Sequence, residues 1–336
     1  MPAPDAVLVL SFGGPEGPDD VVPFLDNVLR GRNVPRERLL AVAEHYHHFG
    51  GVSPLNAQTR ALVRAIESEL DSSGVALPVY WANRNWHPYL ADTVAAMRDD
   101  GVSHAAVFVT SAFGSWSGCR QYRDDLQRVA GAVAGAPELR KLRLYYDHPG
   151  FLESVADGLD ATLAAAGSDP RVWFSAHSIP TSMAACAPYE RQLRWAAAEV
   201  ARRCSLHAWE LVWQSRSGPP RQPWLEPDVR DRLRAQPAGA EVVVCPLGFT
   251  SDHMEVVWDL DAEAAAVAAD AGIRLLRSPT PGTHPAFVRM VRELVAEQLD
   301  PSVPRRSLSP AGPWPDGCPA GCCSLPAPTR RGAHPG

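Results

Sequence analysis

The stretch Gly248-Phe249-Thr250-Ser251-Asp252-His253-Met254-Glu255 follows directly on the apolar run 241–247. A β-branched run that stops at a glycine and then presents ionisable side chains is typical of a buried strand with polar groups at its carboxyl end. Open α/β sheets bind their ligands at that end. If a helix begins near Ser251, Asp252 and Glu255 lie three residues apart on one face and form a carboxylate pair. A capping box between Ser251 and Glu255 explains the same spacing without chemistry, so both interpretations stand.

Length, charge and composition limit the class of protein to which this segment can belong. The chain has 336 residues, 46% of them hydrophobic, which predicts two domains with a large core. The formal net charge is -6, and the sequence has no basic stripe of the kind that nucleic-acid-binding proteins carry. The amino terminus has no cationic segment, and the run 7–12 is too short for a signal or a membrane span. We therefore expect a cytoplasmic chain without membrane insertion. The seven unevenly spaced cysteines favour metal ligation or packing over a disulfide scaffold.

Short β-rich runs alternate with longer Ala-, Leu- and Arg-rich runs that are typical of helices. This alternation predicts an α/β fold with two similar doubly wound domains, each a four-stranded parallel sheet flanked by helices. The expected domains are residues 1–148 and 149–300, since Asp147-His148-Pro149-Gly150 breaks the pattern, followed by a Pro-rich, Cys-containing tail at 301–336. The predicted strands are 7–12, 78–83, 105–111, 141–146, 171–175, 208–214, 241–246 and 273–277, and the predicted helices are 57–70, 90–98, 122–132, 189–203, 259–271 and 285–298.

His177 is the histidine best placed for chemistry. It follows the β-run 171–175 and precedes the turn-forming Pro180, so its ring can project freely. A lone histidine is more often structural. Together with Glu255, however, His177 can form an acid/base pair across a cleft between the two domains.

Other candidate motifs are weaker. His45, His47 and His48 have no neighbouring acid pair or cysteine in the sequence, which favours a solvated helix face over a metal site. Gly13-Gly14 lacks the spacing of a dinucleotide loop, and no G-x-S-x-G nucleophile elbow is present. A nucleotide enzyme and a hydrolase are therefore disfavoured.

Several motifs resemble those of the ferrochelatases, in the same order and at similar spacing. They are LSFGGPEGP (10–18), FGGVSPLN (49–56), SAHSIP (175–180), WQSRSGP (213–219) with PWLEP (223–227), and GFTSDHME (248–255). The resemblance covers residues 5–300 and is strongest to the actinobacterial coproporphyrin III ferrochelatases. It implies a chelatase-like pair of Rossmann-like domains around a porphyrin.

The resemblance also implies an activity, the insertion of Fe2+ into coproporphyrin III to give coproheme in haem biosynthesis. Its catalytic residues would be His177 and Glu255: a neutral imidazole accepts the pyrrole protons, and the carboxylate relays protons or guides the iron. The partners that the resemblance implies are coproporphyrin III, Fe2+ and a downstream enzyme of the haem pathway. The alternatives are a protoporphyrin IX ferrochelatase and a non-catalytic tetrapyrrole or metal carrier.

Polar residues of the first domain are candidates for binding the porphyrin propionates, because carboxylates need charge-assisted donors. These residues are Ser53, Arg84, Asn85, Gln121 and Tyr122. Glu16 corresponds to the position where Firmicute relatives carry an iron-ligating tyrosine, which makes Glu16 a further candidate iron ligand. The first hundred residues show no apolar lip suited to a membrane, which favours the four-carboxylate coproporphyrin.

Cys318, Cys322 and Cys323 crowd into the tail, where a Pro/Gly-rich segment cannot bury them by helix packing. A [2Fe-2S] cluster explains such a group, and it needs a fourth thiolate from elsewhere. Cys186 is the expected fourth ligand, because Cys245 lies in a β-run and Cys204 ends a helix. Cluster-bearing ferrochelatases likewise combine one internal cysteine with three near the carboxyl terminus. A Zn2+ site and free thiols are the alternatives.

Overall fold

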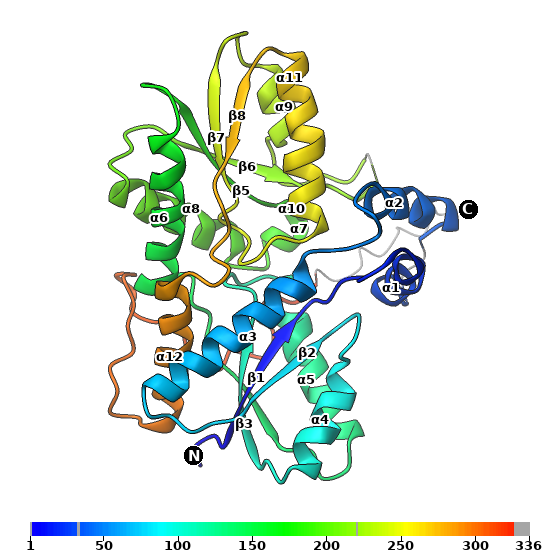
Figure 1. Ribbon diagram of the computed structural model, residues 1–336, viewed down its shortest axis with the longest axis vertical. Coiled ribbons are helices and arrows are strands. Elements are labelled where there is room, and N and C mark those ends of the chain that lie inside the picture. The colour runs from blue at the N-terminus through cyan, green and yellow to red at the C-terminus, as the bar shows by residue number, and fades with distance from the viewer. Residues whose placement is uncertain (1, 32–33, 220, 326–336) are drawn as a thin grey trace, which may run out of the picture.

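The computed structural model describes residues 2–31, 34–219 and 221–325. This part of the chain contains two four-stranded parallel sheets flanked by helices, which confirms the predicted α/β class. Figure 1 shows one sheet above the other, with β1–β4 in the lower unit and β5–β8 in the upper one. The strands are β1 Ala6–Ser11, β2 Val79–Asn83, β3 His104–Val109, β4 Glu138–Lys141, β5 Arg171–His177, β6 Glu210–Gln214, β7 Glu241–Cys245 and β8 Arg274–Arg277.

Five of the six predicted helices form single α-helices, and the sixth, 259–271, divides into a π-helical segment and a short α-helix. Two further long helices, at 36–48 and 149–164, are not among the predicted six, and short helices fill several connections. The α-helices are α1 Val21–Val28, α2 Arg36–His48, α3 Leu55–Ser72, α4 Leu90–Asp99, α5 Gln121–Ala132, α6 Pro149–Ala164, α7 Thr181–Ala184, α8 Tyr189–Arg203, α9 Val229–Arg234, α10 Met254–Val256, α11 Ala265–Asp270 and α12 Pro285–Leu299. A 3-10 turn covers Pro18–Asp20, and π-helical segments cover Trp116–Arg120 and Val257–Ala264.

The two sheets share one topology. The strand orders are β2-β1-β3-β4 and β6-β5-β7-β8, so β1 and β5 occupy equivalent inner positions. Every residue of β1 is buried, as expected for an inner strand of a parallel sheet covered on both faces. The carboxyl ends of the strands in each sheet therefore lie along one edge.

The fourth strand differs from the prediction. We expected it at 141–146, but β4 is the polar segment Glu138–Lys141, which pairs with β3. Residues 142–146, which are apolar except for Arg143, follow it as buried chain outside the sheet. An edge strand does not need an apolar sequence, whereas this connection does, because it runs through the core.

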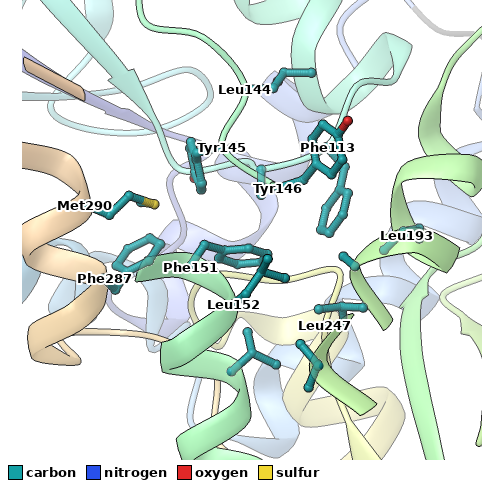
Figure 2. Close-up of a cluster of buried hydrophobic side chains, with 14 of the residues drawn as sticks. Phe113, Leu144, Tyr145, Tyr146, Phe151, Leu152, Leu193, Leu247, Phe287 and Met290 are labelled. Carbon is teal, nitrogen blue, oxygen red and sulfur yellow. The ribbon is translucent and has the colours of Figure 1, made fainter. Parts of the chain in front are cut away.

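One core cluster joins the two units. Figure 2 shows Phe113 and Tyr146 of the first unit near Leu193 and Leu247 of the second, with Phe151 beside them. Helix α12 returns after the second sheet and packs against both α3 and α6. We retain residues 1–148 and 149–300 as the proposed domain bounds, with α12 as an element that connects the two.

Hydrogen bonds also join the carboxyl edges of the two sheets. Thr250, after β7, donates its hydroxyl to the carbonyl of Thr110, after β3, at 3.0 Å. The amide of Gly114 donates to the Gln192 side chain at 2.7 Å. Within the described ranges, every helix is too short or too polar to cross a bilayer.

Candidate active site

The structure brings His177 and Glu255 together. His177 is the last residue of β5, and Glu255 stands in the short helix α10 after β7, the strand paired with β5. Their nearest atoms, Nε2 of the imidazole and Oε1 of the carboxylate, are 3.4 Å apart. The side chains are 30% and 53% exposed, so the pair is open to solvent on one side.

Neighbouring groups fix both residues. The Nδ1 atom of His177 contacts the carbonyl of Ser178, which places the Nδ1 proton there and directs Nε2 at Glu255. The Tyr189 hydroxyl donates to the carbonyl of His177 at 3.1 Å. The Gln214 side chain donates to the carbonyl of Glu255 at 2.7 Å. The pair is therefore held through the backbone carbonyls of His177, Ser178 and Glu255.

The helix start differs from both interpretations of the opening segment. Helix α10 begins at Met254, and its cap is His253, whose Nδ1 accepts from the amide of Glu255 at 3.2 Å. Ser251 therefore does not cap this helix. Asp252 is also not part of a carboxylate pair, because Arg277 holds both of its oxygens at 3.2 Å. Asp252 is a structural ion pair, and Glu255 alone faces His177.

The protonation of the pair follows from its geometry. Burial by itself would lower the pKa of His177, but the charge and hydrogen bond of Glu255 raise that pKa to about 9. Burial likewise opposes ionisation of Glu255, and the charge of His177 nevertheless lowers its pKa. The contact with Glu255 thus favours the protonated ring, whereas the resemblance implies a neutral ring that accepts protons.

Asp259 is a third member of this group that the sequence reasoning missed. It lies one helical turn after Glu255 in the π-helical segment, and the Ser215 hydroxyl donates to it. Burial raises the pKa of Asp259 to about 7, the charges of Glu255 and Glu263 add to the rise, and the Ser215 hydrogen bond opposes it. In the sequence, acidic residues recur every four positions at 255, 259 and 263, and this repeat is the signal that could have indicated Asp259. Glu263 is paired with Arg230 at 2.7 Å.

Two of the predicted porphyrin contacts form one cluster. The Arg84 guanidinium lies 4.7 Å from the centre of the Tyr122 ring and pairs through Nε with Asp125 at 2.5 Å. Tyr122 is buried beneath it, and Gln121 begins the same helix, α5. Arg84 is only 10% exposed, and Asp125 holds its Nε.

The other predicted contacts are engaged elsewhere. Ser53 is buried, with its amide bound to the carbonyl of Pro15 and its hydroxyl beside the amide of Leu55. The Asn85 side chain donates to the carbonyl of Phe12 at 3.2 Å. Glu16 pairs with Arg60 at 2.5 Å, a hydrogen bond that lowers its pKa. To bind a propionate or iron, Ser53, Asn85 and Glu16 would have to share these internal partners with the ligand.

The helix α2 histidines are not all on a solvated face. His47 and His48 are exposed, but the ring of His45 stacks on Trp258, with centroids 4.1 Å apart and planes 8° apart. Trp258 belongs to the π-helical segment that also carries Asp259. The α2 helix therefore contacts the second unit next to the His177 and Glu255 pair.

The tail cysteines lie near Cys119, a neighbour that the sequence does not predict. Cys322 and Cys323 have their sulfurs 3.7 Å apart. Burial raises the pKa of Cys323, and its neighbours Cys322, Cys119 and Cys318 raise it further. Cys119 and Cys318 line one cavity of about 380 Å³. Cys186 instead lies exposed after α7.

The family model described as Ferrochelatase matches residues 4–299. A coproporphyrin III ferrochelatase of Frankia alni is 55% identical to this chain, covering 96% of this chain and 87% of its own length. One of Nocardia farcinica is 52% identical, covering 99% of both chains. A ferrochelatase of Rhodopirellula baltica is 49% identical, covering 96% of this chain and 94% of its own.

Solved structures share the fold at much lower identity. SirB from Bacillus subtilis with Fe3+ superposes with a TM-score of 0.53 at 14% identity, over 87% of this chain and 96% of that one. CbiX, described as the terminal enzyme for biosynthesis of siroheme in denitrifying bacteria, gives 0.53 at 16% identity, over 88% and 100%. These likenesses support the chelatase-like architecture alone.

Proposed function

This chain belongs to the ferrochelatase family, and we propose that it inserts Fe2+ into coproporphyrin III to give coproheme for haem biosynthesis. The observation that carries the proposal is the 3.4 Å contact between His177 and Glu255 at the joined edges of the two sheets. The names of the actinobacterial relatives support the choice of porphyrin. A cytosolic location and a downstream partner in haem synthesis remain predictions from the sequence.

The chemistry needs acceptors for two pyrrole protons as Fe2+ takes their place. We assign the first proton to His177 and the second to Asp259. Fe2+ approaching Glu255 offsets the negative charge that keeps His177 protonated, so the pKa of His177 falls, the imidazolium releases its Nε2 proton to solvent, and the neutral Nε2 becomes a base. Asp259, with a pKa of about 7, exchanges its proton with solvent near neutral pH.

The four carboxylates of coproporphyrin III need cationic or hydrogen-bonding partners. We assign one of them to Arg84, supported from below by Tyr122 and flanked by Gln121. Asn85 and Ser53 stay as secondary candidates, because their polar atoms already have partners. Glu16 would ligate iron only after releasing Arg60, so we place it last among the iron-binding candidates.

One experiment tests the function directly. The full chain is incubated anaerobically with Fe2+ and either coproporphyrin III or protoporphyrin IX, and metal insertion is followed by the visible spectrum. We expect turnover with both and a higher kcat/KM for coproporphyrin III. A preference for protoporphyrin IX would overturn the substrate assignment. Binding of porphyrin and iron without turnover would indicate a carrier instead.

We further propose that the tail thiols hold a [2Fe-2S] cluster. Within the described ranges, no three His, Cys, Asp or Glu side chains already stand as a formed metal site. The donor set nevertheless fits in number and type, because Cys119 and Cys318 line one cavity, Cys322 and Cys323 interact with both of them, and such a cluster takes four thiolates. When bound, the cluster would be structural, since metal insertion involves no redox change.

Cys119 is a better fourth ligand than Cys186. Cys119 lies in the π-helical segment before α5 and shares the cavity with Cys318. Cys186 is exposed, and the thiols that interact with Cys322 and Cys323 are Cys318 and Cys119. We therefore replace Cys186 by Cys119 in the proposed ligand set. Zn2+ remains the competing ion for four thiolates, and metal analysis separates the two.

A further inference from the structure

The C-terminal segment around the three cysteines has little hydrogen bonding of its own. Two backbone bonds close its turns, from the amide of Cys322 to Pro319 and from the amide of Ser324 to Gly321. It forms neither helix nor strand. Cys323 has a φ of 53°, a left-handed conformation that is unfavourable for a residue with a side chain, yet its thiol is buried. Contacts from outside the segment must therefore fix its shape.

Two arginines supply those contacts. Arg123 donates through Nη1 to the carbonyl of Cys318 at 3.3 Å and through Nη2 to the carbonyl of Ala320 at 3.4 Å. Arg120 donates through Nη1 to the same Ala320 carbonyl and to the carbonyl of Cys322 at 3.4 Å. Three carbonyls in a five-residue stretch thus share two guanidinium groups, whose fixed fork of donors suits this arrangement.

The arginines are themselves held in place. The Nε of Arg120 donates to both oxygens of Asp124, at 2.8 and 3.1 Å. The side chains of Arg120 and Arg123 are 22% and 23% exposed, so they lie mostly between the tail and α5. We call Arg120 and Arg123 together the arginine clasp. Cys119 immediately precedes Arg120 in the chain, so the clasp lies next to the Cys119 thiol.

A separate set of contacts guides the tail to this clasp. Arg143, which is buried, donates to both oxygens of Glu297 at 2.8 Å and to the carbonyl of Arg306 at 2.8 Å. Further along, Trp314 packs edge-on against Tyr146, with centroids 6.0 Å apart. The chain is therefore anchored before it reaches Arg120 and Arg123, and only its last described residues depend on them.

We propose that Arg120 and Arg123 are positioning residues that seat Cys318, Cys322 and Cys323 beside Cys119 before any metal binds. The proposal extends the thiol centre put forward above, but it concerns the metal-free chain and stands or falls separately. Its physical basis is the transfer of three carbonyls from water to two preorganised cations.

The test is amide hydrogen exchange on the full, reduced, metal-free chain. In R120A/R123A, exchange in the peptide 316–324 should rise at least about tenfold over wild type, because the local opening no longer breaks these contacts. R128A is the matched control, since Arg128 lies on α5 and pairs with Asp125 rather than with the tail. It should leave that peptide unchanged. Unchanged exchange of the β5 peptide confirms that each variant is folded.

A second measurement uses R120K/R123K, which keeps both charges but loses the fork. Its exchange should lie between wild type and R120A/R123A. Anaerobic reconstitution of R120A/R123A with iron and sulfide should then load less cluster than R128A. Equal exchange in R120A/R123A and R128A would overturn the clasp. A wild type that binds no iron and sulfide would count against the cluster while leaving the exchange result intact.

Discussion

The imidazole of His177 and the carboxylate of Glu255 meet at 3.4 Å although 78 positions separate them, because β5 and β7 are neighbours in one sheet. His177 ends β5 and Glu255 follows β7, and the pairing of these strands sets the distance between their carboxyl ends. The contact couples two protonation states, since each group stabilises the charged form of the other. The reactivity of either residue therefore depends on the partner.

Replacing His177 by Ala should lower kcat for iron insertion by about 10²–10⁴, the usual contribution of a general base. Porphyrin affinity should change little, because His177 acts on protons rather than on propionates. Stopped-flow turnover and fluorescence quenching measure the two quantities. His207→Ala is the matched control, as an exposed histidine before β6, at the opposite ends of the strands. Near-normal turnover in His177→Ala would remove this residue from the mechanism.

Replacing Glu255 by Gln should lower the pKa of His177 from about 9 toward its ordinary value, because the carboxylate makes the largest contribution that raises it. A group whose pKa is raised by folding stabilises the protein below its unfolded pKa, and this contribution is lost as the pH rises through the folded value. The unfolding free energy of wild type relative to Glu255→Gln should therefore shrink between about pH 6.5 and pH 9. Solvent screening keeps the effect small, since the pair is partly exposed.

Urea unfolding at several pH values measures this difference, and an NMR titration of the His177 ring follows the pKa itself. A stability difference that grows with pH would have the wrong sign. A ring that titrates at the same pH in both proteins would show that Glu255 does not control it.

Asp259 predicts an acidic limb in the rate profile. Below about pH 7 Asp259 is protonated and cannot accept the second proton, so kcat should fall as the pH drops through that value. Asp259→Asn should be slow at every pH. Ser215→Ala is more informative, because the hydrogen bond from Ser215 lowers the pKa of Asp259 and its loss should move the limb to higher pH. A limb that stays in place in Ser215→Ala would assign it to another group.

A local sequence pattern marks the residues that could be predicted, whereas tertiary contacts place the residues that were missed. His177 and Glu255 follow apolar β-runs, a local pattern, and topology brings them together. The strand β4 was misplaced because a polar edge strand leaves no such pattern. The His253 cap and the π-helical segment depend on tertiary contacts. Cys119 was missed because the route of the tail, 200 residues later, makes it a neighbour of Cys318.

Arg84→Met should raise KM for coproporphyrin III about tenfold or more with little change in kcat, because one charge-assisted contact to a propionate is lost. The methionine keeps an apolar side chain over Tyr122. Arg128→Met is the matched control, since Arg128 also pairs with Asp125, at 2.7 Å, but is 69% exposed. Steady-state kinetics with varied porphyrin decide the question. Equal KM values in the two variants would exclude Arg84 from porphyrin binding.

Cys119 and Cys186, the two candidates for the fourth ligand, lead to opposite predictions for the visible absorption of the Cys→Ser variants. If Cys119 is the fourth ligand, protein purified anaerobically should be reddish brown, Cys119→Ser should lose the visible absorption, and Cys186→Ser should keep it. Each substitution changes one sulfur to oxygen, so the pair is matched in chemistry and differs in place, buried for Cys119 and exposed for Cys186. Iron and sulfide analysis accompanies the spectra, because zinc bound by the same thiols would be colourless. Colour that survives in Cys119→Ser and disappears in Cys186→Ser would restore Cys186, and a colourless wild type without iron and sulfide would refute the cluster.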